Sequence, residues 1–252
     1  MDPAPDLPAP AQPVHPAVES FAARAAKLTG IEHHIPSWLT PGQPENRLPV
    51  IAAILAAMVL QRAIPDRYTA VPRWPLITLE LALVVLMLVI NPLHMSRETT
   101  IGKWASFVLL AAITADNIAS TIILDHGILT GQISNNAAVL LGSGLAVFIT
   151  NVIVFGIWYW EMDRGGPFAR GSGRRPYPDF QFPQMCDPQN AKPGWRPAFI
   201  DYLYVSYTNV VAFSPTDTMP LSRWAKCLMT VQSMVAMSTI ALVVARAVNV
   251  LK

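Results

Sequence analysis

The chain has 252 residues, of which 52% are hydrophobic and 13% are charged, and its formal net charge at pH 7 is +2. An average soluble domain carries about twice that share of charged residues, so the composition argues against a soluble globular protein. The net charge is too small to indicate nucleic-acid binding. Cys186 and Cys227 are the only cysteines; they match no metal-ligand spacing, and we expect no disulfide between them.

The first 47 residues are predicted to form an N-terminal tail. Residues 1–15 are rich in proline, which prevents helix formation, so we expect an extended, disordered segment. They have neither a basic start nor an apolar run, and therefore do not form a signal peptide. Residues 17–28, AVESFAARAAKL, predict a short amphipathic helix, either at a membrane surface or as a frayed linker.

Five apolar runs predict membrane-spanning helices, because runs of about 18 or more apolar residues with few or no charges are typical of such helices. The first two runs are short and are predicted to tilt little or to thin the bilayer locally. The fourth ends in Trp158, Tyr159 and Trp160, an aromatic cluster typical of headgroup depth. The predicted spans are Leu48–Ile64, Pro75–Ile90, Trp104–Leu124, Ala137–Trp160 and Cys227–Leu251.

These runs divide the chain into the tail (1–47), three spans with their loops (48–136) and a last module (137–252). The loop at 161–198 is rich in Gly, Pro and Arg, which predicts irregular polar structure outside the membrane. The pair Glu161 and Asp163 near its start predicts a solvated turn. The arginines of this loop favour a cytoplasmic location. The last module comprises an outer helix (137–160), the loop (161–198), a broken segment (199–217) and an inner helix (227–251).

The broken segment begins with FIDYLYVSYTNVV, Phe199–Val211, which predicts a helix of about 20 Å that is too short to cross a bilayer. Pro215 and Pro220 then prevent the helix from continuing. Irregular backbone is tolerated at membrane depth only where protein or a water-filled cavity surrounds it. We therefore expect a re-entrant hairpin. The alternative is a helix that lies flat in the interface, with its tyrosines at headgroup level.

The order of span, loop, short helix, return and span resembles the pore module of two-transmembrane potassium channels and their voltage-gated-like relatives. The stretch YVSYTNVVAFSPTD resembles a pore helix and filter, with Thr208 at the leading threonine of the filter and Asp217 at its closing aspartate. The resemblance covers about the last 115 residues and implies a homo-oligomer that passes monovalent cations or protons. It also implies that the 161–198 loop faces outward, against the preference of its arginines. The whole chain is also similar to a group of bacterial multi-span membrane proteins whose function is not established.

The potassium-channel signature Thr-Val-Gly-Tyr-Gly is absent, and no glycine follows Gly194. Filter glycines allow positive φ and close backbone approach, so a carbonyl filter of the potassium type is not expected. Side chains would have to line any ion path instead. For Asp217 the alternative is a role in a local turn, since SPTD forms turn hydrogen bonds readily. The candidate pore residues are Thr208, Asn209, Ser214, Thr216 and Asp217.

Polar residues inside the predicted spans form a second candidate group. A charge at the bilayer centre costs at least about 2.5–3.5 kcal/mol, so Asp116 in span three should face the bundle interior. Asp116 and Glu80 are candidates for contact with a proton or a cation. The alternative for Asp116 is a protonated or hydrogen-bonded carboxyl that holds helices together. Asn117 lies next to Asp116, and Gln232 faces either a cavity or a neighbouring helix.

The sequence thus predicts an all-α integral membrane bundle of five spans and one re-entrant helix, in the inner membrane of a bacterium. The leading functional hypothesis is a channel-like permeation protein assembled from several copies; the alternatives are a non-conducting scaffold and a proton-coupled transporter. We find no catalytic motif, no metal-ligand spacing and no cofactor-binding signature, and expect neither an enzyme nor a nucleic-acid-binding protein. The lipid bilayer is the expected partner.

Overall fold

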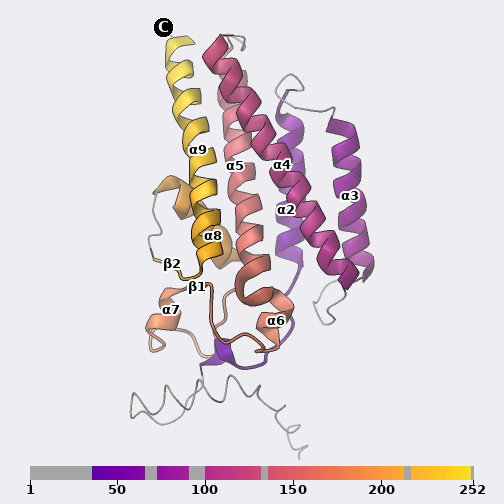
Figure 1. Ribbon diagram of the computed structural model, residues 1–252, viewed down its shortest axis with the longest axis vertical. Coiled ribbons are helices and arrows are strands. Elements are labelled where there is room, and N and C mark those ends of the chain that lie inside the picture. Colours follow the sequence, from indigo (N-terminus) through magenta and orange to yellow (C-terminus); the bar gives the residue numbers. More distant parts are fainter. Residues whose placement is uncertain (1–35, 66–72, 91–99, 132–135, 213–216, 251–252) are drawn as a thin grey trace, which may run out of the picture.

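The computed structural model describes residues 36–65, 73–90, 100–131, 136–212 and 217–250. Within these ranges the chain is mostly helical, with long helices side by side and small elements gathered at one end (Figure 1). The all-α fold class expected from the sequence is confirmed. The extended segment predicted for residues 1–15 and the helix predicted for residues 17–28 lie outside the described residues.

The long helices follow the apolar runs of the sequence. By length and composition, three segments of the described chain could cross a membrane: Thr100–Thr130, Ala138–Gly165 and Arg223–Asn249. Two apolar helices, Leu48–Ala63 and Trp74–Leu86, are shorter than these. The bounds of the long helices are α2 (Leu48–Ala63), α3 (Arg73–Ile90), α4 (Thr100–Thr130), α5 (Ala137–Met162) and α9 (Arg223–Val250).

Helix α4 is longer than the apolar run that predicted it, because no proline interrupts its more polar flanks. It begins four residues before Trp104 and ends six residues after Leu124. Gly131, with φ of +70°, follows its last residue. Helix α9 likewise begins at Arg223 rather than Cys227, and the hydroxyl of Ser222 accepts a hydrogen bond from the Ala225 amide in its first turn. Hydropathy marks the apolar part of a helix and not its capped ends.

Helix α5 lies at the centre of the bundle and packs against α2, α4, α8 and α9, whereas α3 packs mainly on α4 (Figure 1). Its start is capped by Asn136, whose side chain accepts hydrogen bonds from the amides of Ala138 and Val139. Trp158 of α5 donates to the hydroxyl of Thr114 of α4 over 2.8 Å. The central helix therefore positions α2, α4, α8 and α9.

The small elements form a cap, which we define as residues 36–47, 163–198 and 217–222. The strands pair antiparallel, with Phe180 opposite Pro220. Most of the 161–198 loop is irregular, as expected, but the prediction of a solvated turn at its start was wrong: Asp163 is 0% exposed. The elements of the cap are η1 (Ser37–Leu39), η3 (Asp163–Gly165), α6 (Pro167–Gly171), β1 (Phe180–Gln181), α7 (Pro183–Cys186) and β2 (Met219–Pro220).

The half-helix α8 runs from Phe199 to Val211, the bounds that the sequence predicted. It starts beside the cap, where the ring of Phe199 meets that of Trp160 edge to face. The chain returns to the cap after α8, since β2 pairs with β1 and the Leu221 amide donates to the carbonyl of Asp179. The half-helix thus enters the bundle and the chain leaves it at the same end (Figure 1).

Candidate functional site

The inner face of α8 is joined to α5 and α9 by buried polar contacts. The hydroxyl of Ser206 donates to the carbonyl of Val152 in α5 over 2.6 Å. The amide of Asn209 donates to the carbonyl of Met229 in α9 over 3.0 Å. Ser206 is 0% exposed and Asn209 3%. Hydrogen bonds in such surroundings resist exchange with water, so these contacts fix the half-helix on its two neighbours.

Gln232 of α9 is the centre of this network. Its carbonyl oxygen accepts from the hydroxyl of Tyr159 over 2.5 Å and from the amide of Asn209 over 2.9 Å. Its amide nitrogen donates to the hydroxyl and the backbone carbonyl of Ser206, over 2.6 and 3.2 Å. One glutamine therefore joins α5, α8 and α9. The sequence left open whether Gln232 faces a cavity or a neighbouring helix, and the structure shows that it bonds to neighbouring helices.

Gly156 lets the backbones of α5 and α8 come close. A Cβ atom at this position would lie 3.1 Å from the Cα atom of Leu203 in α8. That distance is shorter than an ordinary van der Waals contact, and the atom it meets belongs to the backbone, which cannot rotate away. A methyl group at residue 156 would require the two backbones to separate by a few tenths of an ångström. Small residues at helix interfaces allow this kind of close packing.

The N-terminal half of α8 is held by the cap. The hydroxyl of Tyr202 donates to the carboxylate of Asp163 over 2.6 Å, and both side chains are 0% exposed. The same carboxylate accepts from the backbone amide of Asp179 over 2.8 Å. At the start of α8, the Asp201 carboxylate accepts from the Ala198 amide over 2.7 Å, which satisfies a free donor at the helix end.

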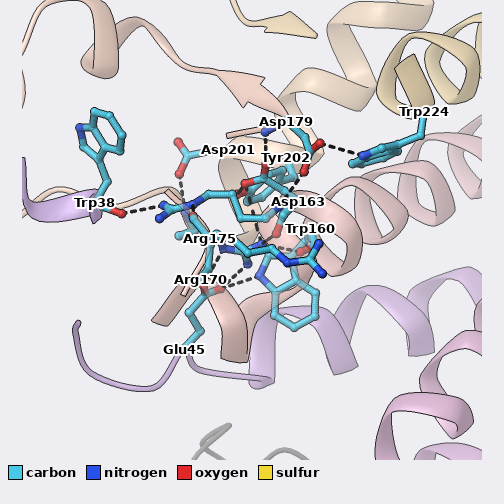
Figure 2. A network of polar contacts seen from close by, with 12 residues as sticks. Trp38, Glu45, Trp160, Asp163, Arg170, Arg175, Asp179, Asp201, Tyr202 and Trp224 are labelled. Atoms are coloured by element: carbon cyan, nitrogen blue, oxygen red, sulfur yellow. Dashed lines mark hydrogen bonds and ion pairs between the residues drawn. The ribbon is translucent and has the colours of Figure 1, made fainter. Parts of the chain in front are cut away.

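Arg170 of α6 binds the ends of three chain segments together (Figure 2). Its guanidinium donates to both carboxylate oxygens of Glu45, each over 3.0 Å, and to the carbonyls of Trp160 and Asp163. It also lies 5.1 Å from the centre of the Tyr202 ring. Trp160 in turn donates from its indole nitrogen to Glu45 over 2.7 Å. The N-terminal segment, the end of α5 and the start of α8 thus share one buried cation.

The charge of Arg170 is kept by its neighbours. Burial alone would lower the pKa of this guanidinium, but the nearby phenol oxygen of Tyr202 and the carboxylates of Glu45 and Asp163 outweigh it and raise the pKa above its ordinary value. An arginine that is 4% exposed needs such partners, because an unpaired buried charge is strongly destabilising. The bidentate contact with Glu45 is the geometry in which a guanidinium and a carboxylate pair best.

Asp179 joins the cap to the start of α9. Its carboxylate accepts from the backbone amide of Arg164 and from the indole nitrogen of Trp224, both over 2.8 Å (Figure 2). Arg164 has φ of 55°, and its guanidinium donates to the carbonyls of Arg175 and Trp38. Between these polar contacts lies the ring of Phe180, which meets those of Tyr202 and Trp224 edge to face. The cap is therefore a packed unit.

The candidate pore residues have different surroundings. Asn209 lies in the network just described and faces away from solvent. Thr208 is half-buried, and its hydroxyl donates to carbonyls of its own helix. Asp217 is exposed, with its carboxylate 3.4 Å from the hydroxyl of Tyr204. Ser214 and Thr216 lie outside the described residues.

The polar candidates inside the predicted spans are all buried. Asp116 is 7% exposed and accepts from the amide of Gln61 in α2 over 3.2 Å. The amide of Asn117 donates to the carbonyl of Val147 in α5 over 3.0 Å. Glu80 of α3 is 0% exposed. The sequence placed Asp116 toward the bundle interior, and its burial agrees with that placement.

Three residues of the site were not singled out from the sequence, Gly156, Arg170 and Ser206, whereas Asp163 was assigned to a solvated turn and Tyr202 belongs to the tyrosines considered as headgroup anchors. Only one of them left a local signal, since Gly156 is a glycine inside an apolar helix and such glycines often mark close packing. The others act through partners far away in the chain. No group of three or more His, Cys, Asp or Glu side chains is placed to hold a metal ion in the described part of the chain.

The comparisons with known proteins gave no relative: no family model, no curated protein and no solved structure matches this chain. The site is therefore interpreted from its own geometry.

Proposed function

We propose that this protein is a five-span membrane protein in which α8 is a re-entrant half-helix. Helices α4, α5 and α9 are long enough to span, and α2 and α3, with 16 and 18 residues, reach about 24 and 27 Å. That nearly matches a hydrocarbon layer of about 30 Å. Large apolar side chains on the outside of the bundle support a lipid environment, among them Val59, Val89, Val108, Ile122 and Leu145.

The depth of α8 carries the proposal. Ser206 meets Val152, which lies ten residues before the end of α5 at Met162, so the contact is about 15 Å from that end. Gln232, the partner of Asn209, lies nine residues after Arg223, about 14 Å into α9. If the cap ends of α5 and α9 lie at the membrane surface, α8 reaches about the bilayer midplane.

We infer that several copies assemble around the hairpin, which we define as residues 199–222, into a pathway for cations. The C-terminal end of a helix carries a partial negative charge, and Asp217 adds a full one on the exposed side of the return segment. The two negative charges lie at different levels of the hairpin, one at the end of α8 and one beside Tyr204, and each favours a cation. The outer face of α8 is exposed in a single chain, where it presents Tyr204, Tyr207 and Val211. One hairpin cannot enclose a pore, so this face would line the pathway or meet a second copy.

A second candidate function, a non-conducting scaffold in the cell membrane, is favoured by Asn209. This residue stands in the filter-like stretch, yet its amide is bonded inside the chain to Met229 and Gln232. A polar group satisfied in this way stabilises packing and offers nothing to a passing ion. In a scaffold the hairpin would only enlarge the surface with which the last module packs against other helices or a partner protein.

Ion flux into proteoliposomes separates the two functions. We expect the purified protein to take up radioactive sodium or rubidium, and Asp217→Asn to lower the uptake severalfold because it removes the exposed carboxylate. Asp187→Asn is the matched control, since Asp187 is an exposed carboxylate of the cap whose bonds are local. Protein that is folded in the liposomes and passes neither ion would support the scaffold and refute permeation.

A further inference from the structure

The outer face of α8 carries two tyrosines that take no part in the contacts with α5 and α9. Tyr204 and Tyr207 are 51% and 50% exposed, respectively. They are three residues apart on the helix, so their side chains are neighbours on one face. Tyr202 and Asn209, by contrast, are buried on the inner side of α8. The outer face therefore presents two accessible aromatic rings.

The carboxylate of Asp217 lies beside the first of these rings. Its Oδ2 atom is 3.4 Å from the hydroxyl oxygen of Tyr204, although the two residues are 13 positions apart in the chain. Because this hydroxyl is attached to the ring, the contact places the carboxylate at the ring edge. Both residues are exposed. A negative charge and an aromatic face thus lie together on the surface of the hairpin.

The charge of Asp217 is not balanced by a basic side chain of the described residues. Arg223 and Lys226 follow it in the sequence and are exposed, but neither forms an ion pair with its carboxylate. The buried cation of the cap, Arg170, pairs with Glu45 and Asp163 instead. The carboxylate of Asp217 is therefore available to a cation that arrives from outside the chain.

This face would be poorly placed against lipid. If α8 enters the bilayer as proposed, Tyr204 and Tyr207 lie about 8 and 12 Å along the helix from its first residue, Phe199. A phenol hydroxyl and a carboxylate both need water or a polar partner at such depth. Several copies around the hairpin meet this need, because the same face of each copy borders one shared aqueous space. Rings and carboxylates from neighbouring chains then converge.

Aromatic faces next to a carboxylate suit an organic ammonium ion better than a metal ion. The face of a ring attracts a cation through its quadrupole, most strongly where the cation is desolvated, and such rings recognise quaternary ammonium groups. Hard metal ions such as Ca²⁺ and Mg²⁺ take about six to eight oxygen ligands. Each hairpin offers two ring faces and one carboxylate, which favours a cation that carries methyl groups.

We propose that Tyr204, Tyr207 and Asp217 form a binding site for a small methylated ammonium ion of the choline type. The carboxylate balances the charge of this ion, and the rings contact its methyl groups. The inference rests on the proposed function, because neighbouring copies are needed to enclose the site. The ligand would bind within the pathway that the hairpins surround.

Saturation-transfer NMR of the purified protein in dodecyl maltoside tests the proposal without requiring ion flux. Choline is titrated, and 3,3-dimethyl-1-butanol serves as an uncharged ligand of the same shape. We expect saturable binding of choline and at least about tenfold weaker binding of the alcohol. Asp217→Asn should weaken choline binding about fivefold or more. Tyr204→Leu should weaken it about threefold to tenfold, whereas Tyr204→Phe keeps the ring and should stay within about twofold of the wild type.

Tyr177→Leu is the matched control, because Tyr177 is an exposed tyrosine of the cap outside the hairpin. All the substituted side chains are exposed, so the variants should unfold at the same temperature as the wild type. Equal binding of choline and the alcohol, or undiminished choline binding in Tyr204→Leu, would overturn the proposal and leave the tyrosines as headgroup anchors. Rubidium flux without choline binding would overturn this inference alone. Choline binding without sodium or rubidium flux would support it and refute permeation.

Discussion

Replacing Gln232 with leucine tests how the half-helix is held. The change removes the acceptor of the Tyr159 hydroxyl, which is 2.5 Å away and buried. An orphaned buried hydroxyl costs about 1–3 kcal/mol. Ser206 loses both of its hydrogen bonds to Gln232 but keeps the one to Val152, and Asn209 loses its bond to Gln232 but keeps the one to Met229. Polar contacts between membrane helices average about 0.6 kcal/mol each. We therefore expect Gln232→Leu to lower the free energy of unfolding by about 2–4 kcal/mol.

The unfolding is followed by far-UV circular dichroism as mixed micelles are titrated with SDS. Thr230→Val is the matched control, because Thr230 is exposed on the same helix and its hydroxyl bonds only to the Lys226 carbonyl. We expect this control to change the free energy of unfolding by less than about 0.5 kcal/mol.

A double variant makes the reasoning sharper. Tyr159→Phe removes the hydroxyl that Gln232→Leu would leave unpaired, so the two changes together should cost less than their sum by about 1–2 kcal/mol. Strictly additive costs would contradict the idea that Gln232 is the required partner of Tyr159. A Gln232→Leu variant as stable as the wild type would refute the inference that the hydrogen bonds of Gln232 stabilise the packing of α8.

Two further predictions concern the cap and the close contact of α8 with α5. Arg170→Met should lower the free energy of unfolding by about 3–5 kcal/mol, because it leaves the buried Asp163 and the partly exposed Glu45 without their cation. Arg170→Lys should restore part of the loss, since it keeps the charge but not the bidentate contact. Both are measured by the same titration, and equal stability of the two variants would contradict the assigned contact. Gly156→Ala should destabilise by at least about 1 kcal/mol because its Cβ meets the backbone of Leu203, whereas Gly142→Ala on the same helix meets nothing within 4 Å and should be neutral or stabilising. Equal effects of the two alanines would show that the close approach does not govern stability.

Much of the fold follows from the sequence because hydropathy is a local property. The apolar runs located all the long helices of the described chain, and Phe199–Val211 was placed correctly because Pro215 and Pro220 prevent the helix from continuing. The longer ends of α4 and α9 were missed, since a helix continues through polar residues that hydropathy does not score.

The cap could not be predicted because its stabilising contacts are long-range. Glu45 and Arg170 are 125 residues apart, and Asp163 and Tyr202 are 39 apart. A loop rich in Gly, Pro and Arg has the same composition whether it is solvated or packed. What distinguishes this loop is that its arginine and aspartate side chains meet aromatic rings and carbonyls from other segments. No periodic pattern in the sequence indicates such long-range contacts.

The direction of α8 through the membrane is the central claim, and spin-label depth measurements test it most directly. Labels at Ile200, Tyr204, Tyr207 and Val211 lie on the exposed face of the helix and do not disturb its packing. From Ile200 to Val211 the chain advances eleven residues, or about 16 Å along the axis. We predict immersion depths that increase steadily along this series, toward the bilayer midplane at Val211. Four labels at one constant headgroup depth would mean that the helix lies flat in the interface and would contradict the account.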